Sequence, residues 1–184
     1  AYVYPRKMRP TRDLLRRRNY LVHKKAELLT HIQTTAIQYN MEPLGRLSRP
    51  CDRKEVSNRF ADPIVRAMVE VDLTVIDQID ELLGTLERSL EKIAERHKPI
   101  PLALLKSIPG VGRILALVIL YEIDDIARFA RVQDFVSYCR LVKPAKESNG
   151  KHYGHSGKKI GNAHLRWAFG EAIILMLRGN PPLQ

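Results

Sequence analysis

The chain has 184 residues, of which 45% are hydrophobic, and a formal net charge of +11 at pH 7. This length supports either one core or one small globular domain with an elongated helical part, and the basic charge favours nucleic acid over an anionic membrane as the partner. Two cysteines far apart in the sequence exclude a disulfide framework and a CxxC metal site, and they fit a reducing cytoplasm. No apolar run reaches the roughly 18 residues that a membrane-spanning helix needs.

The N-terminal third is predicted to be a basic arm followed by a long helix. Residues 1–10 form the arm, because Pro5 and Pro10 disfavour a helix across it. Thr11 is a suitable N-cap, and Asp13 in the first turn complements the helix dipole. From there to about Asn40, apolar residues recur on one stripe near heptad spacing.

The opposite face of this helix is basic. Acidic residues are nearly absent before Glu27, so pairing within the helix cannot neutralise that face. A solvated basic face and a face that contacts phosphates both remain open. The candidate nucleic-acid contacts here are Arg16, Arg17 and Lys24.

A second long helix is predicted from about Pro63 to His97, after a linker at about 41–62 that contains Pro43, Gly45 and Pro50. Its apolar residues keep heptad spacing over about four heptads, and acids and bases alternate on its outer faces. Residues 11–98 are therefore predicted to be a coiled coil or long antiparallel helical hairpin. The helices can pair with each other, with a second copy or with both, and we expect a homo-oligomer.

A compact domain is predicted over residues 99–184. It starts with a short helix at Leu102–Ser107, the turn Ile108-Pro-Gly-Val-Gly112, and a helix at Arg113–Ile123. This order is the helix-hairpin-helix signature, in which glycines let backbone N–H groups meet a phosphate. Gly110, Gly112 and Arg113 are the candidate contacts. An ordinary helix–turn–helix with a glycine turn remains the alternative.

Two further helices are predicted, at about Arg131–Leu141 and at Ala163–Arg178. The last one is nearly apolar on all sides in its second half, so we expect it to be central to the small domain. The predicted fold class is all-α: a long antiparallel helical hairpin or coiled coil, followed by a small helical domain that contains a helix-hairpin-helix.

The stretch Lys143–Asn162 is polar, lacks apolar periodicity and is predicted to be a long loop that presents chemistry. A serine needs a base or metal as a nucleophile, and phosphoryl transfer needs cations on the phosphate oxygens. Ser148 and Ser156 are equal candidates from the residues alone. His152 and His155 are either proton carriers or water-exposed residues, and no metal site is predicted. Candidate phosphate contacts are Lys146, Lys151, Lys158, Lys159, Arg166 and the helix-capping Asn162.

The string YCRLVKPAKESNGKHYGHSGKKIGNAHLRWAFGEA, with IPGVG upstream, resembles the C-terminal domain of DEDD-type insertion-sequence transposases of the IS110 group, the RNA-guided bridge recombinases. The resemblance covers about Leu102–Arg178. Two departures occur: Arg140 stands where many members have glycine, and Lys143 is an extra residue before Pro144. Neither shifts Ser148 relative to Gly150 and Lys151.

The resemblance implies a mechanism. Members of that family carry a metal-binding RuvC-like domain, and a serine in the C-terminal domain attacks a DNA phosphodiester while a structured guide RNA selects the DNA. The matching serine is Ser148, and the implied partners are DNA and the guide RNA in a prokaryotic, nucleoid-associated cytoplasmic protein. A RuvC-like part is not recognisable in this sequence, so Mg²⁺ is expected only in that absent domain, and the isolated chain is expected to catalyse little. The alternative is a non-catalytic nucleic-acid-binding and dimerisation module.

Overall fold

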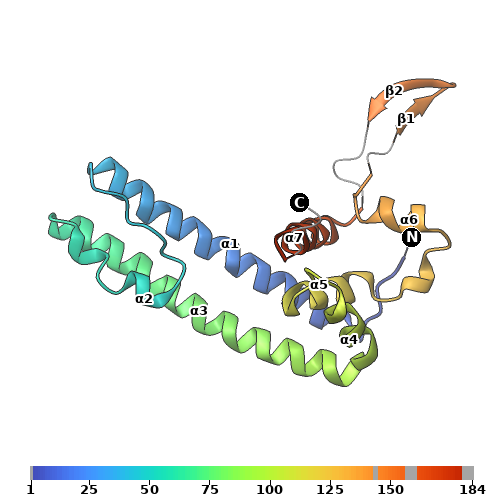
Figure 1. Cartoon of the computed structure of the whole chain (residues 1–184), viewed down its shortest axis with the longest axis horizontal. Helices are drawn as coiled ribbons and strands as arrows, with labels where there is room; N and C mark the ends of the chain where they lie inside the picture. Colours follow the sequence, from blue (N-terminus) through green and yellow to red (C-terminus); the bar gives the residue numbers. More distant parts are fainter. Residues whose placement is uncertain (1, 143–144, 156–160, 180–184) are drawn as a thin grey trace. The chain divides into compact units, whose positions relative to one another are not determined.

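The computed structural model describes residues 2–142, 145–155 and 161–179 (Figure 1). Their regular secondary structure is helical apart from one two-stranded hairpin, which confirms the all-α prediction for the body of the chain. The chain divides into two compact units, residues 16–89 and residues 1–15 with 90–184. Helices α1 (Arg9–Gln38) and α3 (Pro63–His97) contribute residues to both units. Within the described ranges, no helix has both the length and the apolarity to cross a membrane.

The unit of residues 16–89 has its own core. Ile32 and Ala36 of α1 pack with Val69 and Ile76 of α3, and Phe60 from the connecting segment completes the cluster. The heptad pattern therefore predicted both long helices within about two residues of their observed ends. The segment between them contains helix α2 (Pro50–Arg53) and the 3₁₀ helix η1 (Ser57–Arg59).

Arg53 attaches this connecting segment to α3. Its side chain is only 2% exposed, and its guanidinium donates to Asp77 and Asp80, each at 2.7 Å. The same guanidinium donates to the backbone carbonyls of Leu47 and Ser48. A buried arginine is tolerated where its charge is paired and its donors are engaged, as they are here.

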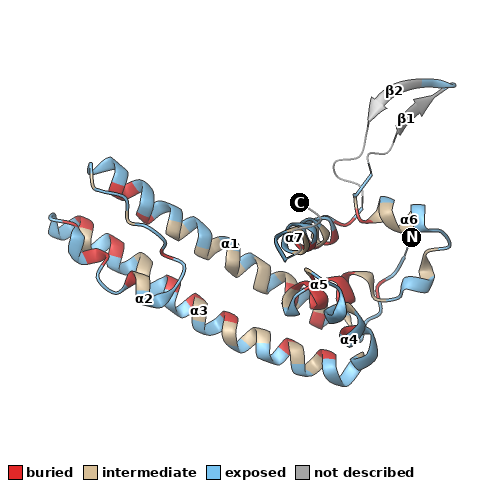
Figure 2. Cartoon of the chain, viewed as in Figure 1, coloured by how far each residue is buried: buried red, intermediate tan, exposed pale blue. Residues whose placement is uncertain are grey.

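The second unit is built around helix α5 (Arg113–Ile123), with α4 (Pro99–Ser107) and α7 (Ala163–Gly179) in contact with it. Residues 115–122 of α5 are all buried, as the continuous red in Figure 2 shows. The expectation that α7 would be the central helix is wrong: it buries Leu165, Ala168 and Ala172, whereas Ile173 and Ile174 are exposed. The remaining elements are the 3₁₀ helix η2 (Ile126–Arg128) and α6 (Val132–Tyr138).

The N-terminal arm packs against the end of α5. The hydroxyl of Tyr4, which is buried, donates to the carbonyl of Tyr121 at 2.6 Å, and that of Tyr2 donates to the Asp124 carboxylate. Burial opposes the charged form of Asp124, but hydrogen bonds from Tyr2 and Lys98 outweigh it and lower the pKa of Asp124. Through Tyr2 and Tyr4, the N-terminal arm is thus packed onto the second unit.

The polar stretch after α6 contains a β-hairpin that the sequence prediction missed. Strand β1 (Ala145–Ser148) pairs antiparallel with β2 (Lys151–His155), with an irregularity between Ala145 and Glu147. Asn149 and Gly150 connect the strands, with φ of 51° and 70°. Positive φ at both central residues is the geometry of a type I′ turn, for which Asn-Gly is the preferred dipeptide. The missed signal was therefore present in the sequence.

Candidate nucleic-acid interface

The turn between α4 and α5, residues 108–112, is fixed by Gly110. Its φ is +83°, a conformation that L side chains rarely adopt. A Cβ at this position would lie 2.2 Å from the carbonyl oxygen of Ala172 and 2.7 Å from the amide nitrogen of Met176, both in α7. The backbone of Gly110 therefore packs closely against α7, a helix of the same unit.

Gly112 has a different environment. It is the N-cap of α5 with φ of −74°, and no heavy atom lies within 4 Å of a Cβ built on it. As a glycine, the N-cap residue has no side chain that could accept from the first-turn amides. The space beside Gly112, where α5 begins, is therefore open. An anion in that space could accept from the first-turn backbone N–H groups of α5.

The two cations that flank the turn share one acidic partner. The Nζ atom of Lys106 lies 2.6 Å from a carboxylate oxygen of Glu91, and Arg113 lies 3.5 Å from the other. Both cations are partly exposed, so Glu91 holds them at the mouth of the turn without enclosing them. The sequence did not reveal this grouping, because Glu91 precedes Arg113 by more than twenty residues.

The hairpin supplies the candidate nucleophile. Ser148 is the last residue of β1 and is directly opposite Lys151, the first residue of β2, in the strand register. Asn149, Gly150 and Lys151 are exposed at this end of the ribbon. Lys146 lies in β1, and His152 and His155 lie in β2. The remaining candidates of this stretch, Ser156, Lys158 and Lys159, lie outside the described residues.

Asn162 caps α7, as the sequence predicted. Its side-chain oxygen accepts from the backbone N–H groups of His164 at 2.9 Å and Leu165 at 3.2 Å. Its side-chain nitrogen donates to Glu122 at 2.7 Å, and both residues are buried. Both the oxygen and the nitrogen of the Asn162 side-chain amide therefore form hydrogen bonds within the protein. Arg166, one turn further along α7, is exposed.

The candidates on α1 belong to the other unit, residues 16–89. The guanidinium of Arg17 stacks on Tyr20 at 4.8 Å from the ring centroid, and Lys24 pairs with Glu27 at 2.6 Å. Arg16 also belongs to this unit. The sequence predicted only that acids within this helix cannot neutralise its basic face, and α3 supplies acids from outside it.

Two neighbours of these candidates pair with acids of α3. Arg18 pairs with Glu87 at 2.7 Å, and Lys25 pairs with Asp80. Both acids belong to α3 and lie more than fifty residues from their partners in sequence. Helix α3 thus balances part of the basic face, which a pattern read along one helix cannot reveal.

Two further findings limit the chemistry of the described residues. They contain no group of three or more His, Cys, Asp or Glu side chains placed to hold a metal ion. Burial raises the pKa of Cys139 to about 11, so this thiol is a core residue and a poor nucleophile.

Comparison with known proteins shows what the compact domain is similar to. Residues 102–184 match the model of the transposase IS116/IS110/IS902 family. The chain is 31% identical over 87 residues to the transposase for insertion sequence element IS1111A of Coxiella burnetii, a match that covers 47% of this chain and 23% of that protein. It is 27% identical over 103 residues to the insertion element IS110 uncharacterized 43.6 kDa protein of Streptomyces coelicolor. This match covers 56% of the chain and 25% of that protein.

These matches span about a quarter of the length of either relative. The family-model match over residues 102–184 includes the α4–α5 turn, the hairpin with Ser148 and helix α7. Through residues 102–184, which are less than half of its length, the chain is similar to the transposase IS116/IS110/IS902 family.

Proposed function

We propose that this chain is the DNA-binding, serine-bearing part of an insertion-sequence transposase, and that a structured guide RNA directs it to its DNA. The family match over residues 102–184 carries this proposal. The name of the Coxiella burnetii relative, a transposase for an insertion sequence element, supports the same reaction class. The net charge of +11 supports contact with a polyanion.

In this proposal, the Ser148 hydroxyl is the nucleophile. Its oxygen forms a bond to a DNA phosphorus, the bond between that phosphorus and one sugar oxygen breaks, and the departing sugar oxygen takes up a proton. The exposed Lys151, directly opposite Ser148 in the register, is placed to stabilise charge on the phosphate oxygens. A second strand end later reverses the step by attacking the phosphoserine.

A serine alone is a weak nucleophile, and the described residues do not fit a metal site. We propose that a separate RuvC-like domain supplies Mg²⁺ and completes the active site. The part of the reaction assigned to this chain is to bind DNA and to hold the serine and its lysines in a defined hairpin.

The DNA contacts in this proposal come from both units. The open N-terminus of α5 at Gly112, with Lys106 and Arg113 beside it, would bind a phosphate in the manner of a helix-hairpin-helix. The exposed Arg17 on α1 and Arg166 on α7 would add contacts. Such binding should weaken steeply as salt rises, because each neutralised phosphate releases counterions.

Self-association through α3 is also part of the proposal. Exposed apolar residues follow one another along α3 at spacings of four, three, four and seven residues. This second stripe lies beside the buried one and has the spacing of a coiled-coil seam. It consists of Ile64, Met68, Val71, Val75 and Leu82.

The deciding experiment replaces Ser148 by alanine in a full-length transposase that contains this sequence. We expect loss of the covalent protein–DNA adduct and a drop in strand joining of about a thousandfold or more, while DNA binding is retained. Ser156→Ala is the matched control, because it removes the other serine of the same stretch and should leave joining intact. Unchanged joining by Ser148→Ala would favour the alternative function, a nucleic-acid-binding and dimerisation module without catalysis.

A further inference from the structure

Helix α6 ends in a closed turn directly before the polar stretch that contains the hairpin. Arg140 has a φ of 57°, and its N–H donates to the carbonyl of Ser137 at 3.0 Å. The N–H of Leu141 donates to the carbonyl of Val136 at 3.1 Å. These bonds form a Schellman motif, which ends a helix and turns the chain away from the helix axis. The motif does not use the carbonyl of Tyr138, the last residue of α6.

The chain returns to this turn at the other end of the polar stretch. The backbone N–H of Asn162 donates to the Tyr138 carbonyl at 2.7 Å, and the side-chain nitrogen of Asn162 donates to the Tyr138 hydroxyl at 3.4 Å. Gly161 has a φ of +89°, and a Cβ there would lie 2.6 Å from the same carbonyl oxygen and 3.3 Å from that of Ser137. A residue without a side chain therefore lets the two ends of the stretch lie against each other. We call this contact of Gly161 and Asn162 with Ser137 and Tyr138 the hairpin junction.

Both sides of the hairpin junction are anchored in the core. Cys139, next to Tyr138, and Leu165, in the first turn of α7, are fully buried. The side-chain oxygen of Asn162 caps α7, and its side-chain nitrogen donates to the buried Glu122 of α5. The junction thus joins α5, α6 and α7 at the point where the polar stretch leaves the core.

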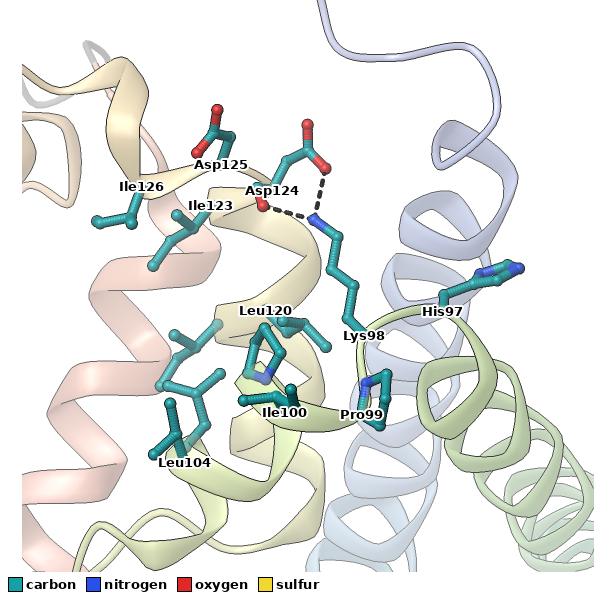
Figure 3. Close-up of a pocket in the computed structure, with 13 residues that line it drawn as sticks. His97, Lys98, Pro99, Ile100, Leu104, Leu120, Ile123, Asp124, Asp125 and Ile126 are labelled. Atoms are coloured by element: carbon teal, nitrogen blue, oxygen red, sulfur yellow. Dashed lines mark hydrogen bonds and ion pairs between the residues drawn. The ribbon is translucent and has the colours of Figure 1, made fainter.

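The end of α5 that carries Glu122 is itself held by residues from elsewhere in the unit. Figure 3 shows Lys98, the N-cap of α4, donating to the carboxylate and to the backbone carbonyl of Asp124, directly after α5. The hydroxyl of Tyr4 donates to the carbonyl of Tyr121. The hairpin junction is therefore attached to a helix whose end is fixed both by the N-terminal arm and by the start of α4.

We propose that the hairpin junction positions Ser148, and that Gly161 is a positioning residue for the step in which Ser148 attacks phosphorus. This inference rests on the proposed function, in which Ser148 is the nucleophile. The stretch leaves and re-enters the core at one point, and between these ends β1 and β2 pair with each other, with Ser148 at the end of β1. An attacking oxygen must lie in line with the bond that breaks, and a displacement of about 1 Å costs on the order of a hundredfold in rate.

This role is separable from the capping of α7. The cap uses the side-chain oxygen of Asn162 and needs no particular residue at position 161. The close approach of Gly161 to the end of α6 adds a different property, because it closes the polar stretch at its base. In the proposal Gly161 contacts no reacting atom and acts on Ser148 only through that closure.

The first test needs no variant. Because the backbone N–H of Asn162 donates to Tyr138, hydrogen exchange in the full chain should be slower at this amide than at a free amide by about a hundredfold or more. Two-dimensional NMR of the labelled chain measures the rate. Exchange of Asn162 at the rate of a free amide overturns the hairpin junction, whether or not any variant of Gly161 folds.

The second test measures where the hairpin lies relative to α6. Nitroxides are attached at Lys151→Cys in β2 and at Val132→Cys in α6, both exposed, in a Cys51→Ser chain, and pulsed dipolar EPR gives the distance distribution between them. Gly161→Ala places a methyl group 2.6 Å from a backbone oxygen at a positive φ, so it should broaden that distribution about twofold or more. An unchanged distribution overturns the proposal.

Gly45→Ala is the matched control for backbone strain. Gly45 has a φ of +73°, but no heavy atom lies within 4 Å of a Cβ built on it, and it belongs to the other unit. The substitution therefore strains the backbone in a similar way without touching the hairpin junction. It should leave both the distance distribution and the reaction rate unchanged.

The third test uses a full-length transposase that contains this sequence, in single turnover at saturating DNA. Gly161→Ala should lower the rate constant for formation of the Ser148 adduct about tenfold or more, while the Kd for DNA stays within about twofold. A purely structural role would instead lower the amplitude, which counts folded molecules, and leave the rate constant intact. That result overturns the positioning role.

Failure of the proposed function is distinguishable from failure of this inference. An adduct that Ser148→Ala retains would contradict the nucleophile assignment, and the exchange and distance measurements on the full chain would be unaffected by it. A Ser148 adduct whose rate constant is the same in Gly161→Ala and wild type would leave the nucleophile in place and overturn only the role of Gly161.

Discussion

Helices α4 and α5 are consecutive in the chain and similar in composition, yet they differ in burial. Residues 115–122 of α5 are all enclosed, whereas only Leu102 of α4 is. The difference lies in the neighbours, because α5 contacts both α4 and α7 while the outer face of α4 contacts none of the described elements to a comparable extent. Apolar composition therefore predicts a helix that must be covered, and only the three-dimensional arrangement shows whether its own fold covers it.

The largest expected effect comes from shortening a side chain in the enclosed helix. Leu117 of α5 is fully buried, and Leu117→Ala should lower the free energy of unfolding by about 3–4 kcal/mol through lost apolar contacts and a residual cavity. Leu104→Ala in α4 is the matched control, with an expected loss below about 0.5 kcal/mol. Urea denaturation at protein concentrations below the dimerisation range measures both.

The comparison of α4 with α5 would fail if the two leucine variants lost similar stability under those conditions. A small loss for Leu117→Ala alone would mean that the surrounding helices collapse into the space. A large loss for Leu104→Ala at low concentration would mean that α4 is covered within one copy of the chain.

The turn between the two helices allows a second test with two glycines. Gly110→Ala places a methyl group 2.2 Å from a backbone oxygen of α7, at a φ of +83°, and backbone cannot yield as a flexible side chain can. We expect a loss of about 2–3 kcal/mol. Gly112→Ala meets open space at an ordinary φ, so thermal unfolding should place it within about 0.5 kcal/mol of the wild type. Equal effects would show that Gly110 is not held against α7.

The local parts of this structure were predictable from the sequence. Heptad spacing predicted the two long helices, and the spacing of the last helix from the polar stretch predicted the Asn162 cap. Arg140 has a φ of 57°, a left-handed conformation that glycine adopts more readily than arginine. The Asn-Gly turn was equally local and was missed, because the surrounding strands lack the apolar alternation that usually reveals them.

The long-range parts were not predictable. Glu91 meets Lys106 and Arg113, and Glu122 meets Asn162 across 40 residues of sequence. The choice of α5 rather than α7 as the central helix depends on how three apolar helices divide their contacts, and each sequence taken alone is compatible with either position. The candidate site was thus predictable as a set of residues and not as a set of contacts.

The smallest of these effects concerns the junction through which α5 holds α7. Asn162→Ala removes the cap of α7 and the donor to Glu122, and should cost about 1–2 kcal/mol. Asn162→Asp keeps the capping oxygen but sets a carboxylate beside that of Glu122. Because two adjacent carboxylates favour binding of a proton in the folded state, this variant should regain stability as pH falls from about 7 to about 5. Urea titrations at both pH values measure the change. A difference between Asn162→Asp and wild type that is constant over this range would mean that Asn162 acts on α7 as a cap alone, and that the contact with buried Glu122 adds nothing to the attachment of α7 to α5.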